Sequence, residues 1–351
     1  MTDQAVQLLQ RLIAIPSLSR QEDKAADAIE AHLREKGVEC HRFRNNVWAL
    51  SDNYDPQKPT LMLNSHIDTV KPSASYTFDP FAPFIADGKI YGLGSNDAGA
   101  SVVSLITAFC AMRGENLAVN LLLAISAEEE VMGVDGMRAL LPHLKEQGIS
   151  IDMAVVGEPT GMQPAVAERG LMVLDCVAHG VSGHAARNEG VNAIYKAMDD
   201  IDILRNLQFP RVSEMLGPIK ITVTQIEAGY QHNAVPDTCK FVADVRTTDA
   251  YTNIETLELI RAAVKSDVKE RSTRIQASAI SLSHPLVKAA IAFGGEPYVS
   301  PTTSDMAAMP DFPSLKLGPG QSSRSHTADE YVLISEIDDA IKKYILLLKS
   351  L

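Results

Sequence analysis

The chain has 351 residues, of which 46% are hydrophobic and 22% charged, ordinary values for a folded, soluble protein. Its net charge of −12 disfavours nucleic acids and anionic membranes as partners. No apolar run approaches the roughly 20 residues that span a bilayer, and the N-terminus lacks a signal-peptide pattern. The four cysteines lie far apart without a CxxC pair, which argues against disulfides and thiolate zinc sites and predicts a cytoplasmic location.

The first half of the chain has the pattern of an α/β layer structure. The opening MTDQAVQLLQ predicts an amphipathic helix. From residue 60 to about residue 170, short apolar strands alternate with helical patterns. Strands are expected at Leu61–Leu63, Leu121–Ile125 and Met153–Val156, and a helix over Ala98–Met112. Such alternation is typical of a largely parallel sheet covered by helices.

The order of expected strands and helices then changes to that of a smaller α+β domain. Its expected elements are a strand at Leu171–Ala178, a helix at Asn192–Asn206, strands at Ile219–Ile226 and Cys239–Arg246, a helix at Asn253–Val268 and a strand at Arg274–Ser281. The order β-α-β-β-α-β is that of a ferredoxin-like unit. A helix at Leu286–Phe293, a strand at Ser314–Leu317 and a helix at Ser335–Leu348 resume the first pattern. We therefore expect an α/β domain of residues 1–171 and 283–351 with an insertion of residues 172–282.

An acid or a histidine follows each expected strand of the larger domain. These features are His66-Ile67-Asp68, Asp97 after Ile90–Tyr91, the run Glu128-Glu129-Glu130, Glu158 in Gly157-Glu158-Pro159-Thr160, and His326 after a glycine-rich turn. Open α/β sheets bind ligands beyond the carboxyl ends of their strands. Each feature alone has an ordinary structural explanation, such as a surface pair, a tight turn or a helix start. Together they predict a cation site, because crowded carboxylates repel one another unless cations lie between them.

At these residues the chain resembles the acetylornithine deacetylase/succinyl-diaminopimelate desuccinylase family of co-catalytic zinc amidohydrolases, whose relatives include aminoacylase and carboxypeptidases. The resemblance covers nearly the whole chain and is strongest to acetylornithine deacetylase. It is carried by His66-Ile67-Asp68-Thr69-Val70, Asp97, Gly157-Glu158-Pro159-Thr160 and Gly318-Pro319-Gly320 with His326. It implies a zinc-hydrolase catalytic domain, with the insertion serving as a lid and dimerisation domain.

The resemblance implies two divalent metal ions, zinc in the first place, with cobalt or manganese able to substitute. One ion would be held by His66, Asp97 and Glu158, and the other by Asp97, Glu130 and His326. The family has a glycine six residues after its metal-binding glutamate, and six residues after Glu130 is Gly136. Glu129 is therefore expected to be the catalytic base, and Asp68 to fix the tautomer of His66.

Lid residues are expected to complete the site. The resemblance assigns His184 to the family's oxyanion-stabilising histidine, which acts on the partner subunit of a homodimer. Asn233 and Arg246 match lid positions that approach the substrate carboxylate, where an arginine offers a bidentate clamp. Thr303 and Ser304 lie in a further stretch of resemblance and are expected to bind substrate.

The expected reaction is hydrolysis of the amide bond of a small N-acyl amino acid. The resemblance favours N-acetyl-L-ornithine, cleaved to ornithine and acetate in arginine biosynthesis. Alternatives with the same chemistry are N-succinyl-diaminopimelate desuccinylation, deacylation of N-acyl-citrulline or N-succinyl-ornithine, and dipeptide cleavage. A catalytically inactive scaffold is disfavoured because the base and all five ligands are present.

Overall fold

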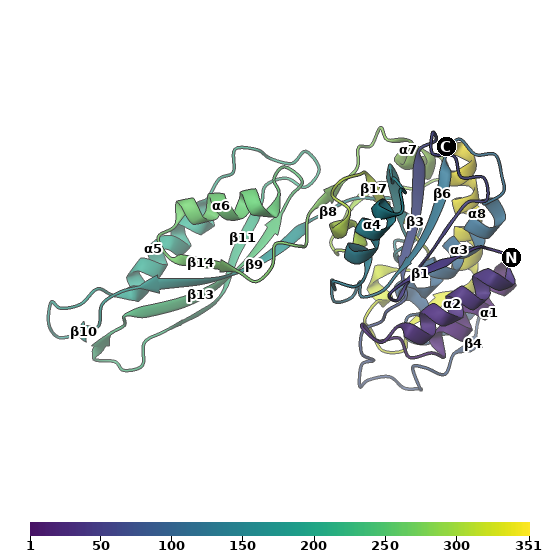
Figure 1. Cartoon of the computed structure of the whole chain (residues 1–351). Coiled ribbons are helices and arrows are strands. Elements are labelled where there is room, and N and C mark those ends of the chain that lie inside the picture. Colours follow the sequence, from purple (N-terminus) through teal and green to yellow (C-terminus); the bar gives the residue numbers. More distant parts are fainter. The chain divides into compact units, whose positions relative to one another are not determined.

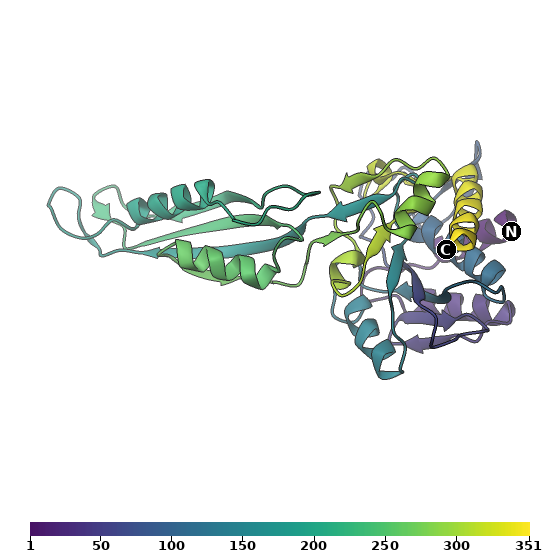
Figure 2. The same cartoon turned by 90° about the horizontal axis from the view of Figure 1, so that it is seen from above.

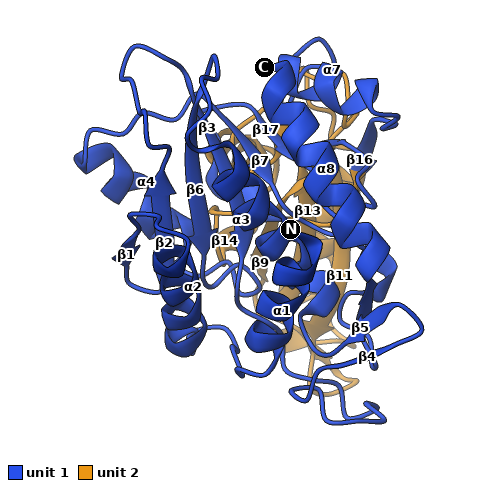
Figure 3. Ribbon diagram, turned by 90° about the vertical axis from the view of Figure 1, so that its right-hand side faces the viewer, with its two compact units in different colours: residues 1–166, 280–299, 304–351 blue, residues 167–279, 300–303 orange.

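The computed structural model describes all 351 residues, which form two compact units. Unit 1 comprises residues 1–166, 280–299 and 304–351, and unit 2 comprises residues 167–279 and 300–303 (Figure 3). The chain thus leaves unit 1 after residue 166 to build nearly all of unit 2, and enters unit 2 again only for residues 300–303. Each unit has its own sheet and its own hydrophobic core.

Unit 1 is built on most of a nine-stranded sheet with the order β1-β2-β6-β3-β7-β17-β8-β15, in which β16 also pairs with β8. The strand β15 and the second half of β8 belong to unit 2. Its centre consists of four parallel strands, and the strands at both edges are antiparallel. The strands are β1 (His41–Phe43), β2 (Asn46–Leu50), β3 (Thr60–His66), β6 (Asn120–Ser126), β7 (Met153–Val156), β8 (Ala165–Glu168), β15 (Ser278–Ala279), β16 (Tyr298–Ser300) and β17 (Ser314–Lys316).

Helices cover both faces of this sheet. On one face lie α1 (Thr2–Ile13), α3 (Ala100–Met112) and α8 (Ile334–Ser350), which pack against one another (Figure 3). The other face carries α4 (Met137–Glu146), which shares a core with Met62 and Leu122 of the sheet (Figure 1). All seven residues of β3 and of β6 are buried, as expected for central strands between two helix layers. The helices α2 (Asp23–Glu35) and α7 (Pro285–Ala292) complete the unit. None of the helices in the chain combines the length and the hydropathy that a membrane-spanning helix requires.

The strand expected at Ile90–Tyr91 does not belong to the main sheet. It is β5 (Lys89–Tyr91), the middle strand of a small antiparallel sheet with β4 (Phe84–Ala86) and β18 (Tyr331–Leu333). The prediction that Asp97 follows a strand of the parallel sheet is therefore wrong. Asp97 lies in the turn Ser95–Gly99 directly before α3, and its own backbone angles are not helical.

Unit 2 has the predicted β-α-β-β-α-β order, which confirms the ferredoxin-like fold. Its sheet has the antiparallel order β11-β13-β9-β14, and α5 and α6 lie side by side on one face (Figure 2). The elements are β9 (Gly170–His179), α5 (Ala193–Asn206), β11 (Lys220–Ala228), β13 (Thr238–Thr247), α6 (Asn253–Ala263) and β14 (Asp267–Glu270), with a short pair of β10 (Gly183–His184) and β12 (Ala234–Val235).

The last two elements of unit 2 differ from the prediction. The helix expected over Asn253–Val268 ends at Ala263, and the fourth strand is Asp267–Glu270 rather than Arg274–Ser281. The helix ends there because the buried Asp200 carboxylate on α5 accepts hydrogen bonds from the backbone N–H groups of Lys265 and Ser266, at 3.1 and 2.7 Å. Within the stretch expected as the final strand, only Ser278–Ala279 is a strand, and it pairs with β8 of the large sheet.

Candidate metal centre

Three of the predicted ligands lie at the carboxyl edge of the parallel strands. His66 is the last residue of β3, Glu130 follows β6, and Glu158 follows β7. Because β6, β3 and β7 are parallel neighbours, their carboxyl ends meet at one edge and bring these side chains together. His66 Nε2 lies 3.6 Å from Glu158 Oε1, and the His66 side chain is 1% exposed.

Asp97 lies between two histidines. Its Oδ1 atom is 3.3 Å from Nε2 of His66, and its Oδ2 atom is 3.6 Å from Nε2 of His326. His326 Nε2 also lies 3.0 Å from Glu130 Oε2. The five predicted ligands therefore converge in unit 1, with Asp97 as the member shared by the two halves of the group.

The side chains of the adjacent residues Glu129 and Glu130 have different neighbours in the cluster. Glu130 faces His326 and also groups with His66 and Asp97, whereas Glu129 Oε2 is 3.9 Å from His66 Nε2 and groups with His66 and Glu158. Glu129 is also deeply buried, with 8% of its surface exposed. Its carboxylate is therefore close enough to the ligands to exchange a proton with a group held between them.

The electrostatics of the cluster favour bound cations. Burial raises the pKa of Glu158 to about 8, and the nearby Asp97 and Glu130 carboxylates also raise it. Burial raises the pKa of Glu129 well above its usual range, with Glu158 and Asp305 acting in the same direction. Burial also raises the pKa of Glu130. Several carboxylates thus share one buried space with few cationic side chains, and oxygen and imidazole donors of this kind suit zinc.

The carboxylate of Asp68 fixes the backbone on which the glutamates are carried. It accepts hydrogen bonds from the N–H groups of Glu129 and Glu130, at 2.9 and 3.1 Å, and from the hydroxyl of Ser19 at 2.7 Å. Nδ1 of His66 lies 3.0 Å from the Asp68 carbonyl oxygen and 3.4 Å from its carboxylate. The carbonyl oxygen and the carboxylate of Asp68 thus both face the imidazole of His66. Through its bonds to Glu129 and Glu130, Asp68 also connects the carboxyl ends of β3 and β6.

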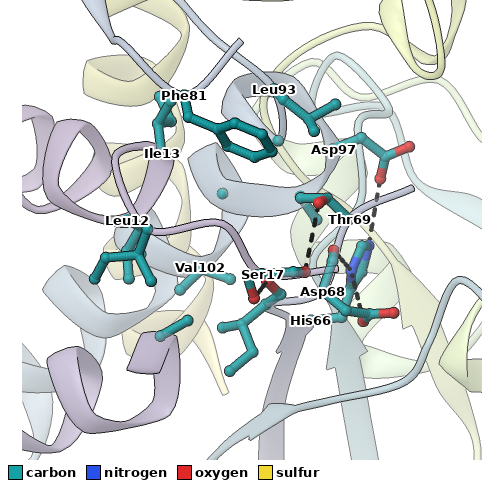
Figure 4. Close-up of a pocket in the computed structure, with 16 residues that line it drawn as sticks. Leu12, Ile13, Ser17, His66, Asp68, Thr69, Phe81, Leu93, Asp97 and Val102 are labelled. Carbon is teal, nitrogen blue, oxygen red and sulfur yellow. Dashed lines mark hydrogen bonds and ion pairs between the residues drawn. The ribbon is translucent and has the colours of Figure 1, made fainter. Parts of the chain in front are cut away.

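A narrow cavity lies behind the ligands, between the loop after α1 and the start of α3. Figure 4 shows His66 and Asp97 in its wall, together with Ser17 and Thr69. The Ser17 hydroxyl donates to the carbonyl of Ile67, and the N–H of Thr69 donates to the carbonyl of Ser17. The N-terminal loop is thereby joined to the segment that carries His66.

Three residues of this region were not singled out from the sequence. They are Ser19 on Asp68, Asp305, whose carboxylate accepts from Ser126 Oγ at 2.6 Å, and Glu330, which accepts from the N–H of Asp97 at 2.9 Å. None of them follows a strand of the parallel sheet, so the strand-end pattern could not find them. The available signals were the position of Asp305 beside the noted Thr303 and Ser304, and that of Glu330 four residues after His326.

The predicted lid residues all belong to unit 2. His184 on β10 is exposed and lies beside Asn233, since the N–H of Ala185 donates to the Asn233 carbonyl. Arg246 lies near the other end of β13 and makes two hydrogen bonds to Asp244, at 2.8 and 3.1 Å. Within one chain, therefore, the residues expected to contact the substrate carboxylate, Asn233 and Arg246, are not neighbours.

The two remaining predicted substrate residues lie in the connection before the 3-10 turn Asp305–Ala308. Thr303 is half-buried, and Ser304 is fully buried. The hydroxyl of Ser304 accepts from the N–H of Met306, so this side chain caps the turn.

Comparison with known proteins agrees with this arrangement. The model of peptidase family M20/M25/M40 matches residues 62–350. The chain therefore belongs to this family, which confirms the predicted membership of a metal-dependent hydrolase family.

The similar curated proteins are named succinyl-diaminopimelate desuccinylase. The one from Paracoccus denitrificans (strain Pd 1222) is 31% identical over 279 residues, 75% of this chain and 73% of that protein. The one from Wolbachia pipientis subsp. Culex pipiens (strain wPip) is 29% identical over 266 residues, 72% of this chain and 66% of that protein. The match thus spans slightly less than two thirds of the Wolbachia protein. These names do not support the expected closeness to acetylornithine deacetylase.

Solved structures show the same fold. Aminopeptidase PepT from Bacillus cereus ATCC 10987 has a TM-score of 0.78 at 18% identity, covering 100% of this chain and 98% of that one. The YXEP protein of Bacillus subtilis, described as a dinuclear metal binding peptidase from the M20 family, has a TM-score of 0.70 at 16% identity, covering 99% and 97%. At these identities the likeness concerns the fold alone, and it confirms the predicted fold class.

Proposed function

We propose that this protein hydrolyses the amide bond of a small N-acyl amino acid with the help of two divalent metal ions. The observation that carries the proposal is the position of Asp97, whose two carboxylate oxygens face two different histidines. Each histidine has a further carboxylate beside it, Glu158 on one side and Glu130 on the other. A shared carboxylate between two such groups is the arrangement that two neighbouring ions require.

His66, Asp97 and Glu158 would hold one ion, and Asp97, Glu130 and His326 the other. Zinc is the first candidate, because the donors are imidazole nitrogens and carboxylate oxygens without a thiolate. When bound, such ions polarise a carbonyl group and lower the pKa of water towards neutrality. The raised pKa values of Glu158 and Glu130 support this assignment, since nearby positive charge would let both carboxylates ionise.

Glu129 is proposed as the general base. Its carboxylate accepts the proton of the attacking water and later donates it to the nitrogen of the leaving amine. Burial favours this exchange because it raises the pKa of Glu129 well above its usual range and so stabilises the protonated intermediate state of the side chain. The hydrogen bond from the Glu129 N–H to Asp68 holds the carboxylate beside the ligands while the proton is transferred.

For the substrate, we propose N-succinyl-diaminopimelate as the first candidate. The similarity to proteins named succinyl-diaminopimelate desuccinylase supports this choice over N-acetyl-ornithine. N-acetyl-ornithine is the second candidate, supported by the resemblance around Thr302–Asp305 and Gly318–Val332. Both substrates present an amide next to a free carboxylate, so the catalytic groups proposed above serve either one.

A product-release assay tests both levels of the proposal. Purified zinc-loaded protein is incubated with N-succinyl-diaminopimelate, N-acetyl-ornithine, N-succinyl-ornithine and N-acetyl-citrulline, and the freed amine is measured. We expect the highest kcat/KM with N-succinyl-diaminopimelate and a release about 10²–10⁴-fold slower by the Glu129→Gln variant. A higher kcat/KM with N-acetyl-ornithine would reject the substrate choice, whereas no release from any amide would reject the reaction.

The lid residues enter the proposal as contributions from a second subunit. We propose a homodimer through unit 2, in which His184 donates a hydrogen bond to the oxyanion formed at the scissile carbonyl of the neighbouring chain. The exposure of His184 and its position beside Asn233 support a joint role of these two residues. Arg246, Thr303 and the buried Ser304, whose hydroxyl caps a turn, remain candidate substrate contacts.

A further inference from the structure

A buried carboxylate holds the turn that carries Asp97. Glu330 is 2% exposed, and its Oε1 atom accepts hydrogen bonds from the N–H groups of Asn96 and Asp97, at 2.8 and 2.9 Å. Its Oε2 atom accepts from the N–H of Gly94 at 3.1 Å. Three backbone donors of one turn thus converge on a single side chain, an arrangement that binds anions strongly.

A second set of contacts joins the same turn to the segment before His326. The Asn96 side chain, which is fully buried, accepts from the N–H of Gln321 at 2.9 Å and donates to the Gln321 carbonyl at 3.1 Å. It also lies within hydrogen-bonding distance, 3.3 Å, of the hydroxyl of Ser325. Asn96 therefore ties the turn to Gln321 and Ser325, five residues and one residue before His326, while Glu330 ties it to a position four residues after.

These contacts matter because Asp97 and His326 come from distant parts of the chain. Neither residue lies on the parallel sheet, so the sheet alone does not set the distance between them. Asp97 must also present one oxygen to each histidine, and a small rotation of its backbone would displace both oxygens. The N–H of Asp97 is the group that Glu330 holds, so this rotation is what the contact opposes.

We propose that Glu330 is a positioning residue for the paired metal ions, acting through the backbone of Gly94–Asp97, with Asn96 as its helper on the other side of the turn. The inference rests on the proposed metal centre. Residues that orient metal ligands typically change metal affinity about 10–100-fold when they are replaced.

The test is a zinc titration of metal-free protein by calorimetry, together with zinc content after dialysis. Glu330→Gln replaces one acceptor oxygen with an N–H₂ group, which would face a backbone N–H donor. We expect binding of at least one of the two ions to weaken about 10–100-fold in Glu330→Gln, with the metal-free protein still folded although about 1–3 kcal/mol less stable. Asp329→Asn is the matched control, because Asp329 is the adjacent acid but accepts from Thr77 instead of the Asp97 turn.

Unchanged affinity for both ions in Glu330→Gln would overturn the inference, as would an equal loss in Asp329→Asn. Should Glu330→Gln not fold, Asn96→Ala replaces it as the test. That variant should also weaken zinc binding, and wild-type affinities would count against the proposal. The wild-type titration separates the two levels of the argument, because fewer than two bound ions there would contradict the metal centre itself.

Discussion

At the scale of single residues, the adjacent Glu129 and Glu130 are assigned different tasks. Glu129→Gln removes the base but no proposed ligand, so turnover should fall about 10²–10⁴-fold with the zinc content unchanged. Glu130→Gln removes the carboxylate beside His326, and about one zinc ion per chain should be lost. Metal analysis and kcat of the two purified variants check this assignment. Loss of zinc in Glu129→Gln together with full zinc in Glu130→Gln would show that the roles are reversed.

Asp305 gives the region a pH dependence that does not require metal. Burial raises the pKa of Asp305 to about 6, from an ordinary value of 3.8, with Asp68 acting in the same direction. The folded protein therefore binds this proton more tightly than the unfolded chain does. The stability contributed by the protonated carboxyl is complete below pH 3.8 and is lost as the pH rises through about 6.

Asp305→Asn should remove this dependence, because the amide keeps an acceptor for the Ser126 hydroxyl but carries no charge. Relative to the wild type, we expect the variant to gain up to about 3 kcal/mol of unfolding free energy between pH 4 and pH 7. Urea unfolding of the metal-free proteins at both pH values measures the difference. A difference that stays constant with pH would mean that Asp305 titrates normally.

At the scale of elements, the parallel sheet explains why three of the proposed ligands meet. A hydrogen-bond acceptor on another helix explains why the end of α6 differs from the prediction. The carboxyl ends of β6, β3 and β7 bring together His66, Glu130 and Glu158, as the strand pattern predicted. The end of α6 was mispredicted because its apolar pattern continues to Val268. The chain leaves the helix at Val264 because Asp200, on another helix, offers the next two N–H groups a better acceptor.

Asp200→Ala tests this explanation. The substitution leaves the buried N–H and hydroxyl of Ser266, and the partly buried N–H of Lys265, without their acceptor, so unit 2 should lose about 1–3 kcal/mol of stability. Asp202→Asn on the same helix is the control, because Asp202 forms an exposed pair with Arg205 and should change stability by less than about 0.5 kcal/mol. Urea unfolding followed by circular dichroism compares the variants. Equal effects of the two substitutions would contradict the capping role.

At the scale of the whole molecule, the proposed dimer builds each active site from Glu129 of one chain and His184 of the other. His184→Ala should lower turnover on the order of 10²–10³-fold while both ions stay bound, because it removes one oxyanion donor. In a random mixture of His184→Ala and Glu129→Gln subunits, half of the dimers are mixed and carry one complete site of two. Activity should then recover to about a quarter of the wild-type value. Mixed dimers that remain inactive would show that His184 does not act across subunits.

The sequence by itself determined the donors of the site, the two layer patterns and the family. These features could be predicted because they are local: His66 ends a parallel strand, Glu130 and Glu158 come within four residues of one, and the periodicity of a helix or strand is visible within about ten residues. It also indicated the ferredoxin-like order of unit 2, although not the position of its last strand.

Only the tertiary structure decided how Asp97 is held, where α6 ends, and that Asn233 and Arg246 lie apart within one chain. The first two depend on polar groups that are distant in sequence and adjacent in space, namely Glu330 with Asp97 and Asp200 with Ser266. A buried acceptor that satisfies the backbone of another segment leaves no periodic pattern in its own segment. Its partner becomes visible only when the packed fold excludes water and each buried N–H group must find an acceptor within the protein.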